Sequence, residues 1–436
     1  MKNSPLRSSL MTRGALGALS IACLWGLVPT SEAHAAGFQN MSQSATANGM
    51  GSMGTANPDE PNASFYNGAN LALREGFEVY VGDTILLPGS TYESLDGSVQ
   101  AETVSQVFPP PNFHLGVPID LKGAGTLGLG MGVTLPYGLG IAWEDDWVGR
   151  AYIISQDLQT FNFNPNLSYK VPNIDLALGV GAQIYHANVK LVRKVILRDD
   201  TEVLSTIAGS GQGYGATASM MYRPNQHVSL GLNYRSAVTL DIDGKARFEG
   251  EEDTPFDQTF VDQGGSTVIS IPHALTFGVG WTYDKVFVGL DVNYTTWSRN
   301  QQTVLEFERP CQQGSQTCDP SIDRTDPPTS IINSNWNDAM AFRLGLQYEV
   351  VEDLKIRTGF VYDMTPVPEQ TLSPSLPDND RAVISGGIGY TLKGVRGDFG
   401  YQYVKALRRE VRDTENLPGV YETSAHVFGV NLGYGY

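Results

Sequence analysis

The 436-residue sequence lacks a long apolar run anywhere beyond its first 35 residues. A helix that crosses a membrane needs about 20 consecutive apolar residues, so spanning helices are excluded for that part of the chain. Hydrophobic residues make up only 41%, and 48 Gly and 20 Tyr accompany them. This composition is unusual for a soluble core. If the chain crosses a bilayer, it does so with strands.

Positive charge, histidine and cysteine are also scarce. The formal net charge of -17 argues against nucleic acid as a partner. The six His lie in no recognisable motif, which disfavours an outer-membrane lipase with a Ser, His and Asp or Asn set. Cys311 and Cys318 lie close together in "CQQGSQTC" with no His nearby, so we expect a structural disulfide rather than a metal site. No enzyme activity, metal or cofactor is expected.

The N-terminus has the features of an export signal. Three basic residues precede the apolar run "GALGALSIACLWGLV", and "AHA" at 33–35 supplies small residues for cleavage. Residues 1–35 are therefore predicted to be a signal peptide, with a mature chain that begins near Ala36. A lipoprotein anchor at Cys23 is the alternative, but Ser20 stands where a lipobox usually has Leu.

The rest of the chain alternates between apolar and small or polar residues. In "ALTFGVGWTYDKVFVGLDVNYTTW" (274–297) every second residue is apolar, and the residues between are mostly Thr, Gly, Asp and Asn. In "TLGLGMGVTLPYGLG" the odd-numbered residues from Leu127 to Leu139 are expected to share one apolar face. A period of two indicates strands and is incompatible with helices.

Fourteen segments follow this pattern, and the connections between them alternate between short and long. The segments are 76–88, 110–120, 124–142, 152–171, 174–196, 211–223, 227–249, 267–283, 286–306, 334–350, 354–365, 380–392, 397–410 and 420–436. A soluble β-sandwich is the alternative, but its strands average about 5–6 residues. Longer strands, an even number and two loop classes favour an all-β, antiparallel 14-stranded transmembrane barrel over residues 76–436. Its apolar face would contact lipid, since an open edge in hydrocarbon leaves backbone groups unpaired.

Residues 36–75 break the alternation. This segment is rich in Asn, Gly and small residues, and a disordered tail is one interpretation. However, "FYNGANLAL" is apolar and comes directly before the first strand. Because fourteen strands enclose more space than eight, we expect 36–75 to fold into the lumen as a plug, or hatch.

Several segments resemble the outer-membrane long-chain fatty acid transporter family, FadL, which includes uptake channels for aromatic hydrocarbons. "SFYNGANLA" stands where the family has an Asn-Pro-Ala motif in its hatch, with Gly68 in place of the proline. The segments "IPHALTFGVGW", "VNYTTWS", "WNDAMAFRLGLQY" and "IRTGFVYDMTPVPEQTLSPSLPDNDR" resemble family segments in order and spacing. The final strand, which ends on Tyr436, is similar to the signal that the barrel assembly machinery recognises in such proteins.

This resemblance implies passive uptake of hydrophobic molecules across the bacterial outer membrane. Substrate would be captured at outer loops, pass to a pocket above the hatch and leave through the wall at a kink in the third strand. The expected hatch residues are Asn67, Gly68, Ala69 and Leu71; the candidate lateral opening is Gly132, Pro136 and Gly138, although these glycines could instead make room for the hatch. The candidate substrate contacts are Phe108, Phe256, Phe260, Val261, Arg235, Arg343 and Arg357.

Alternation places the three arginines in the lumen, where they could hold a carboxylate head group or pair with acids such as Asp291, Glu349 or Asp363. The expected partners are a long-chain fatty acid or other hydrophobic molecule and outer-membrane lipid and lipopolysaccharide, with the protein acting as a monomer. A general diffusion porin and a channel specific for monoaromatic hydrocarbons remain the alternatives.

Overall fold

The computed structural model describes residues 37–196, 202–249, 262–308 and 329–435. The predicted signal peptide, the Cys311–Cys318 pair and three candidate loop residues, Phe256, Phe260 and Val261, lie outside this part. Within the described residues, no helix combines the length and apolar character needed to span a membrane.

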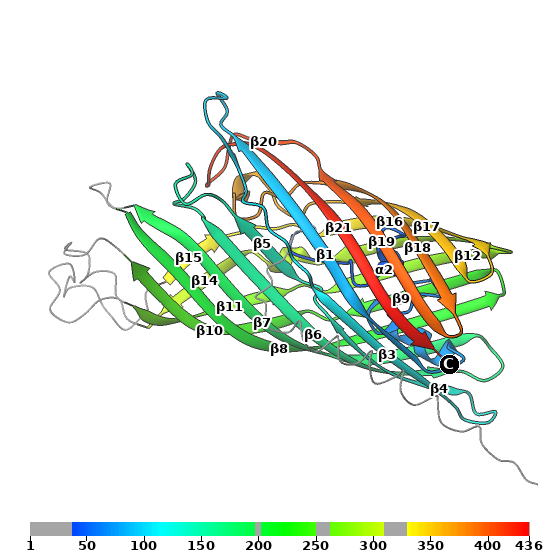
Figure 1. Ribbon diagram of the computed structural model, residues 1–436. Helices are drawn as coiled ribbons and strands as arrows, with labels where there is room; N and C mark the ends of the chain where they lie inside the picture. The colour runs from blue at the N-terminus through cyan, green and yellow to red at the C-terminus, as the bar shows by residue number, and fades with distance from the viewer. Residues whose placement is uncertain (1–36, 197–201, 250–261, 309–328, 436) are drawn as a thin grey trace, which may run out of the picture. The chain divides into compact units, whose positions relative to one another are not determined.

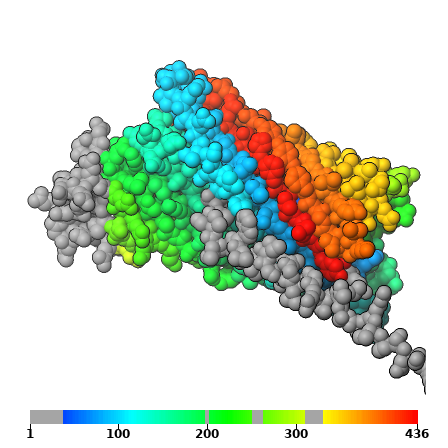
Figure 2. Space-filling model, in the orientation of Figure 1, coloured from blue at the N-terminus to red at the C-terminus, as the bar shows by residue number. Residues whose placement is uncertain are grey.

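The described strands form one sheet that closes on itself. All neighbouring pairs in this 21-stranded sheet are antiparallel, and β1 pairs with β21 from Glu78↔Gly435 to Glu93↔Val420. Figure 2 shows these two strands side by side across the outer surface. Five wall strands are each split into two elements, and β2 and β20 are short loop strands, so the wall has fourteen strands. The prediction of a 14-stranded antiparallel barrel is confirmed.

The first half of the wall runs from β1 to β10. Its elements are β1 (Glu78–Glu93), β2 (Gln100–Glu102), β3 (Pro111–Asp120), β4 (Thr126–Thr134), β5 (Gly138–Ala142), β6 (Ser155–Lys170), β7 (Leu176–Ile196), β8 (Glu202–Asn225), β9 (Val228–Arg235) and β10 (Val238–Glu249). In β4/β5 and β9/β10, one wall strand is interrupted by two or three residues.

The second half closes the barrel (Figure 1). Its elements are β11 (Gln263–Ile271), β12 (Ala274–Tyr283), β13 (Val286–Thr295), η3 (Trp297–Arg299), β14 (Gln302–Phe307), β15 (Thr329–Asn333), β16 (Ala339–Val351), β17 (Leu354–Asp363), η4 (Glu369–Thr371), β18 (Arg381–Leu392), β19 (Val395–Ala406), β20 (Arg409–Val411) and β21 (Gly419–Gly435). The pairs β11/β12, β13/β14 and β15/β16 are the other split strands.

The two faces of the sheet differ as the alternation predicts. On β12, Leu275, Phe277 and Trp281 are exposed, whereas Thr276 is buried in the lumen. β6 follows the same rule, with exposed Phe163 and a row of buried asparagines. Because apolar side chains cover the outside, the wall is suited to contact lipid.

The third wall strand departs from the predicted alternation. Tyr137 and Leu139 were expected on the outer face with Leu129, yet both are buried inside. Between the pairs Thr134↔Asn162 and Gly138↔Gln159, the third strand advances by four residues and β6 by three. This extra residue is a β-bulge, and it exchanges the two faces of the strand beyond it.

The hatch region, residues 37–73, fills the lumen, as expected. It contains α2 (Ala45–Asn48), α3 (Ala63–Tyr66) and η1 (Gly68–Leu73), and their residues are almost all buried. α2 contacts β18, β19 and β21, and η1 contacts β3, β4, β6, β7 and β8. Side chains cap α2 and η1: Ser44 accepts a hydrogen bond from the N–H of Ala47, and Asn67 accepts one from the N–H of Ala69.

Candidate functional site

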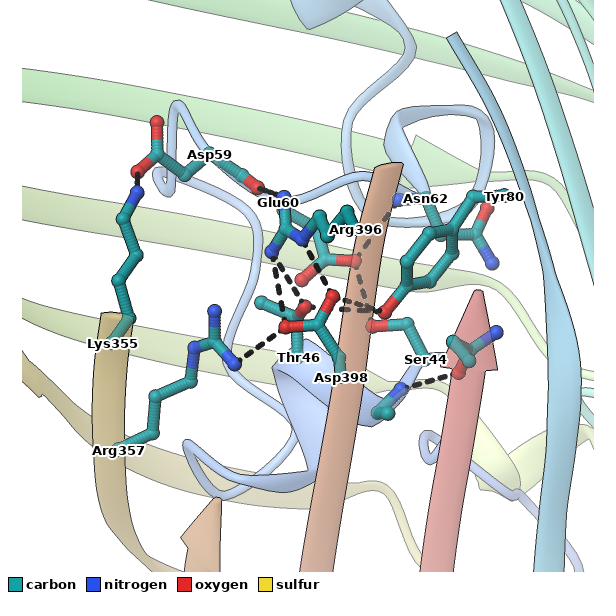
Figure 3. Close-up of polar contacts among 12 residues, drawn as sticks. Ser44, Thr46, Asp59, Glu60, Asn62, Tyr80, Lys355, Arg357, Arg396 and Asp398 are labelled. Carbon is teal, nitrogen blue, oxygen red and sulfur yellow. Dashed lines mark hydrogen bonds and ion pairs between the residues drawn. The ribbon is translucent and has the colours of Figure 1, made fainter. Parts of the chain in front are cut away.

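A cluster of charged groups connects the hatch to the wall (Figure 3). Asp398 on β19 lies 2.7 Å from Arg357 of β17, also forms an ion pair with Arg396, and accepts a hydrogen bond from Tyr80 at 3.0 Å. Arg396 donates to the hydroxyl of Thr46 on α2 at 2.8 Å. Buried charges are stable only when they are paired, so these bonds fix α2 to the wall.

A second contact of the hatch is made by Asp59 and Glu60. Asp59 forms an ion pair with Lys355 of β17. Glu60 accepts the hydroxyl of Ser44 at 2.7 Å and the N–H of Asn62 at 3.0 Å, and its Oε2 has no hydrogen-bond partner among the described residues. Burial raises the pKa of the Glu60 carboxyl to about 7. The hatch therefore contains a carboxyl group that titrates near neutral pH.

The predicted hatch residues lie where η1 meets the wall. The Asn67 amide donates to the carbonyl of Thr55 at 2.8 Å and to that of Met220 on β8 at 3.0 Å. A Cβ on Gly68 would come within 2.7 Å of Asn166 Oδ1, which explains the absence of a larger residue there. Ala69 and Leu71 are fully buried against the wall.

Glycines on the lumen face of β4 make room for this segment. A Cβ at Gly128 would lie 2.5 Å from the backbone nitrogen of Ala72, and one at Gly130 would lie 2.6 Å from a methyl group of Leu71. At Gly132 the Cβ would lie 3.0 Å from that of Ser64. Gly132 thus accommodates the hatch, which was the alternative interpretation of this residue.

The kink of the third strand is occupied by the start of the hatch. Residues Leu135–Tyr137 lie between β4 and β5, and residues 38–43 bond to them and to Gly138. Asn40 N–H donates to Pro136 O and Gly138 N–H to Phe38 O, both at 2.8 Å. The Gln43 side chain accepts the N–H of Leu135 at 3.0 Å and donates to its carbonyl at 2.9 Å. We call residues 37–43 the N-terminal segment.

Aromatic side chains hold the beginning of this segment. The Phe38 ring lies 4.8 Å from Trp297, 5.8 Å from Trp336 and 6.0 Å from Tyr137. The N–H of Gly37 donates to the buried Asp378 carboxylate at 3.1 Å. Burial raises the pKa of Asp378, which lies in the loop before β18.

Beyond these aromatic rings lies a cavity of about 460 Å³, which we call the outer cavity. Strands β7, β10, β11, β14 and β15 contribute to its walls, at the end of the barrel that carries the long connections. Its apolar lining includes Phe38, Leu139, Leu158, Leu191, Ile269 and Trp336. Arg193 of β7 also lines it, and the Nε of this arginine has no hydrogen-bond partner among the described residues. Lys245, Glu306 and Glu415 also line the cavity, so it combines apolar surface with charged groups of both signs.

The three predicted arginines are buried in the lumen, but they do not line the outer cavity. Arg235 donates to the carbonyl of Phe65 and lies 3.9 Å above that ring. Arg357 pairs with Asp398 and not with the acids expected from the sequence. Arg343 is paired in register with Asp291, but Arg343 Nη1 and Asp291 Oδ1 each lack a hydrogen-bond partner among the described residues.

Phe108 also lies away from the outer cavity. It is buried against Leu86 and Val427, because a bridge between Leu86 and Phe108 aligns its segment with β1. Two residues of the site were missed by the sequence analysis. Arg193 continues the lumen-facing series of β7 and could have been found by extending the alternation. The contact of Gln43 with Leu135 has no signal in the sequence.

A closed barrel with an apolar outer face, a lumen plugged by its own N-terminus and a partly apolar cavity above the plug defines the class of plugged outer-membrane barrels. Residues 26–436 match the family described as "Outer membrane protein transport protein (OMPP1/FadL/TodX)". The chain therefore belongs to this family, and its location is the outer membrane.

Curated relatives extend over most of the chain. The long-chain fatty acid transport protein of Escherichia coli O6:H1 is 24% identical, with 99% of this chain and all of the relative covered. Outer membrane protein P1 of Haemophilus influenzae is 26% identical over 81% of each chain. These relatives are named as transport or outer-membrane proteins and not as enzymes.

Solved structures share the fold. A FadL homologue from Pseudomonas aeruginosa superposes with a TM-score of 0.75 at 18% identity, covering 93% of this chain and 98% of the other. The toluene transporter TbuX of Ralstonia pickettii gives a TM-score of 0.67 at 16% identity, with coverage of 90% and 98%.

Proposed function

We propose that the protein takes up hydrophobic molecules passively across the outer membrane, with long-chain fatty acids as the favoured class. Substrate is captured by the outer loops, moves into the outer cavity above the hatch and leaves sideways through the wall into lipid. The proposal depends on the outer cavity itself, where apolar side chains lie beside Arg193, whose Nε has no hydrogen-bond partner among the described residues.

The chemistry of the cavity suits an acyl chain. Burial of apolar surface yields about 25 cal/mol per Å², so the rows of Leu, Ile and aromatic side chains favour a hydrocarbon over water. A carboxylate head group would pair with the Arg193 guanidinium, whose Nε has no hydrogen-bond partner among the described residues. The predicted arginines lie deeper, beside the hatch.

The exit route is supported by the kink of the third strand. Residues Leu135–Tyr137 bond to the N-terminal segment instead of to β3. Phe38 of that segment lines the outer cavity. Displacement of the N-terminal segment would therefore connect the cavity to the wall at Pro136 and Gly138, while the rest of the hatch stays bonded to the barrel.

A monoaromatic hydrocarbon is the second candidate substrate. The aromatic rings of Phe38, Trp297 and Trp336 border the outer cavity and would stack on a small ring. Such a molecule would not need Arg193. Replacement of Arg193 with Met thus separates the two substrates: fatty acid uptake should fall and toluene uptake should persist.

Deletion of Pro136 tests the exit route. Removal of one residue from the bulge lets β4 and β5 continue in one register with β6. We expect uptake of a radiolabelled long-chain fatty acid by cells that lack their own channel to fall about tenfold or more, because the restored ladder closes the wall.

The matched control is Pro136→Ala, which keeps the extra residue and should leave uptake near the wild-type level. Both variants should assemble in the outer membrane and show heat-modifiable migration. Undiminished uptake by the deletion variant would contradict exit at the kink. If cells that express the unmodified protein took up no more fatty acid than cells without it, the function itself would be contradicted.

A further inference from the structure

A second interruption of the wall lies between β11 and β14. Strand β11 pairs with β14 at only three positions, ending at Thr267↔Leu305. Pairing resumes between β12 and β13 at Ala274↔Thr295, just below a contact in which Thr296 N–H donates to His273 O at 3.0 Å. Among the described residues, no backbone hydrogen bond crosses between 268–272 and 297–303. We call this gap the wall window.

The window arises from a mismatch in length. Between the pairs Thr267↔Leu305 and Ala274↔Thr295, one strand advances by seven residues and the opposite strand by ten. The extra residues form η3, which turns Trp297 inward until its ring lies 5.1 Å from Trp336. The neighbouring β15/β16 strand follows, with Trp336 N–H donating to Asn300 O at 3.2 Å. Both strands thus bend toward the lumen, away from β11.

Strand β11 does not follow this bend, because its other edge is held by β10. That ladder is continuous from Val238↔Ile271 to Ala246↔Gln263. The six steps from Thr267 to His273 correspond to about 20 Å along the strand. The window is therefore long enough to admit a hydrocarbon chain.

The edges of the window line the outer cavity. Val268, Ile269 and Ser270 contribute from β11, and Asn300, Gln302 and Thr303 from the opposite side. Val268 is 49% exposed, and it pairs in register with Asp241, which is exposed on the outer face of β10. The outer cavity is thus continuous with the flank of the barrel at this level.

The height of the window fits the boundary between lipid and water. The lipid-facing residues of β12 begin at Leu275, immediately below it, and Tyr234 and Tyr294 lie in register with Leu275 on the two neighbouring strands. Aromatic residues at strand ends mark the interface of outer-membrane barrels. Unpaired backbone groups at the edges would be costly in hydrocarbon, whereas the polar outer layer can bond to them.

We propose that amphiphiles already dissolved in the outer lipid layer reach the outer cavity sideways through the wall window. The ligand class is a molecule with a hydrocarbon chain and a polar head, such as a long-chain fatty acid. Sideways admission spares the chain a passage through water, which is unfavourable for every methylene group. This inference rests on the proposed function and adds a second point of access to it.

A cysteine at the edge of the wall window provides the test, because a bulky label on its thiol can obstruct the window after the protein has folded. Ser270→Cys, with Cys311 and Cys318 changed to Ser, would be labelled with a bulky or a small methanethiosulfonate reagent. The matched control is Thr239→Cys, since Thr239 pairs with Ser270 on β10, is exposed and does not line the cavity.

Proteoliposomes with a lipopolysaccharide outer leaflet would contain a fluorescent fatty-acid-binding protein. Labelled fatty acid would be supplied either within the outer leaflet or as an albumin complex in water. We expect the bulky reagent at position 270 to slow leaflet-supplied transfer at least about fivefold and water-supplied transfer less than about twofold, with recovery after reduction. The small reagent and the control should have little effect.

Equal transfer rates before and after the bulky label would overturn the proposed entry through the window. An equal fall in the transfer rate for both modes of supply would also overturn it. If the unlabelled protein transferred no fatty acid from either source, the proposed function would fail, and the window with it.

Discussion

At the residue scale, the hatch and the wall fit together through small side chains and paired charges. Glycines on β4 leave space for η1, and Asp398 joins two arginines and a tyrosine below α2. Both features follow from the enclosure of the lumen. A larger side chain has no free volume there, and a charge has no bulk water to replace a lost partner.

Gly128→Val tests the close contact between η1 and the wall. The added methyl groups would collide with the backbone at Leu71 and Ala72. We expect the variant to lose about 1–3 kcal/mol of stability, the usual cost of overpacking, and to conduct more ions in planar bilayers because the hatch is displaced. Leu129→Val, one residue away on the lipid face, is the control and should retain wild-type conductance.

Protonation of Glu60 should make the hatch sensitive to pH. Its pKa of about 7 lies above the ordinary 4.5, so the buried group binds protons more tightly than the exposed one. This contribution to stability is fully present below pH 4.5 and is lost as the pH rises to 7. Amide exchange of residues 44–62, corrected for intrinsic rates, should therefore be slower at pH 5.5 than at pH 8.

Glu60→Gln is the control, because its neutral amide does not titrate. The variant should show the same hatch protection at both pH values. If wild-type protection rose between pH 5.5 and pH 8, the assignment of a raised pKa to Glu60 would be refuted.

At the scale of elements, bends in the wall strands determine where the sheet can open. The β4/β5 bulge turns Leu135–Tyr137 toward the N-terminal segment, and η3 turns Trp297 toward Phe38. Both bends meet at the aromatic rings below the outer cavity. The N-terminal segment thus contacts the wall at two interruptions of the sheet.

Gln43→Ala should loosen the seal at the kink. The variant loses two hydrogen bonds to Leu135, which leaves the N–H and the carbonyl of that residue unpaired. We expect a loss of about 1–3 kcal/mol and faster exchange of the Leu135 amide, without a change in the β12 amides. Hydrogen exchange measured by mass spectrometry resolves both regions. An unchanged Leu135 amide would show that Gln43 does not close the kink.

The sequence predicted the wall better than its interruptions. Strict alternation in 274–297 placed Phe277 outside and Thr276 inside, since each side chain depends only on its own position in the pleat. The prediction for the third strand was wrong beyond Pro136, because a bulge shifts the alternation by one residue. The sequence contains a Pro there, but it does not state how many residues the kink adds.

The candidate site was harder to predict for a related reason. Alternation correctly placed Arg235, Arg343 and Arg357 inside the barrel. It does not give their position along the barrel axis, and this position decides whether they line the cavity and can contact substrate. Phe108 was misplaced because its contacts come from a loop that folds back on β1. Contacts between distant segments leave no local pattern.

At the scale of the whole molecule, the barrel combines a lipid-facing outer surface with a lumen that its own N-terminus plugs. The hatch bonds to wall strands that include β1, β8, β17 and β21, so displacement of the N-terminal segment need not release the rest. The protein is therefore expected to admit hydrophobic molecules while it remains nearly closed to ions. A general diffusion porin would behave in the opposite way.

The most direct test measures both properties on the same purified protein in planar and vesicle bilayers. We expect single-channel conductance far below that of an open porin, together with protein-dependent transfer of a labelled long-chain fatty acid. A large, steady ion conductance with no transfer of fatty acid above the protein-free rate would contradict this expectation.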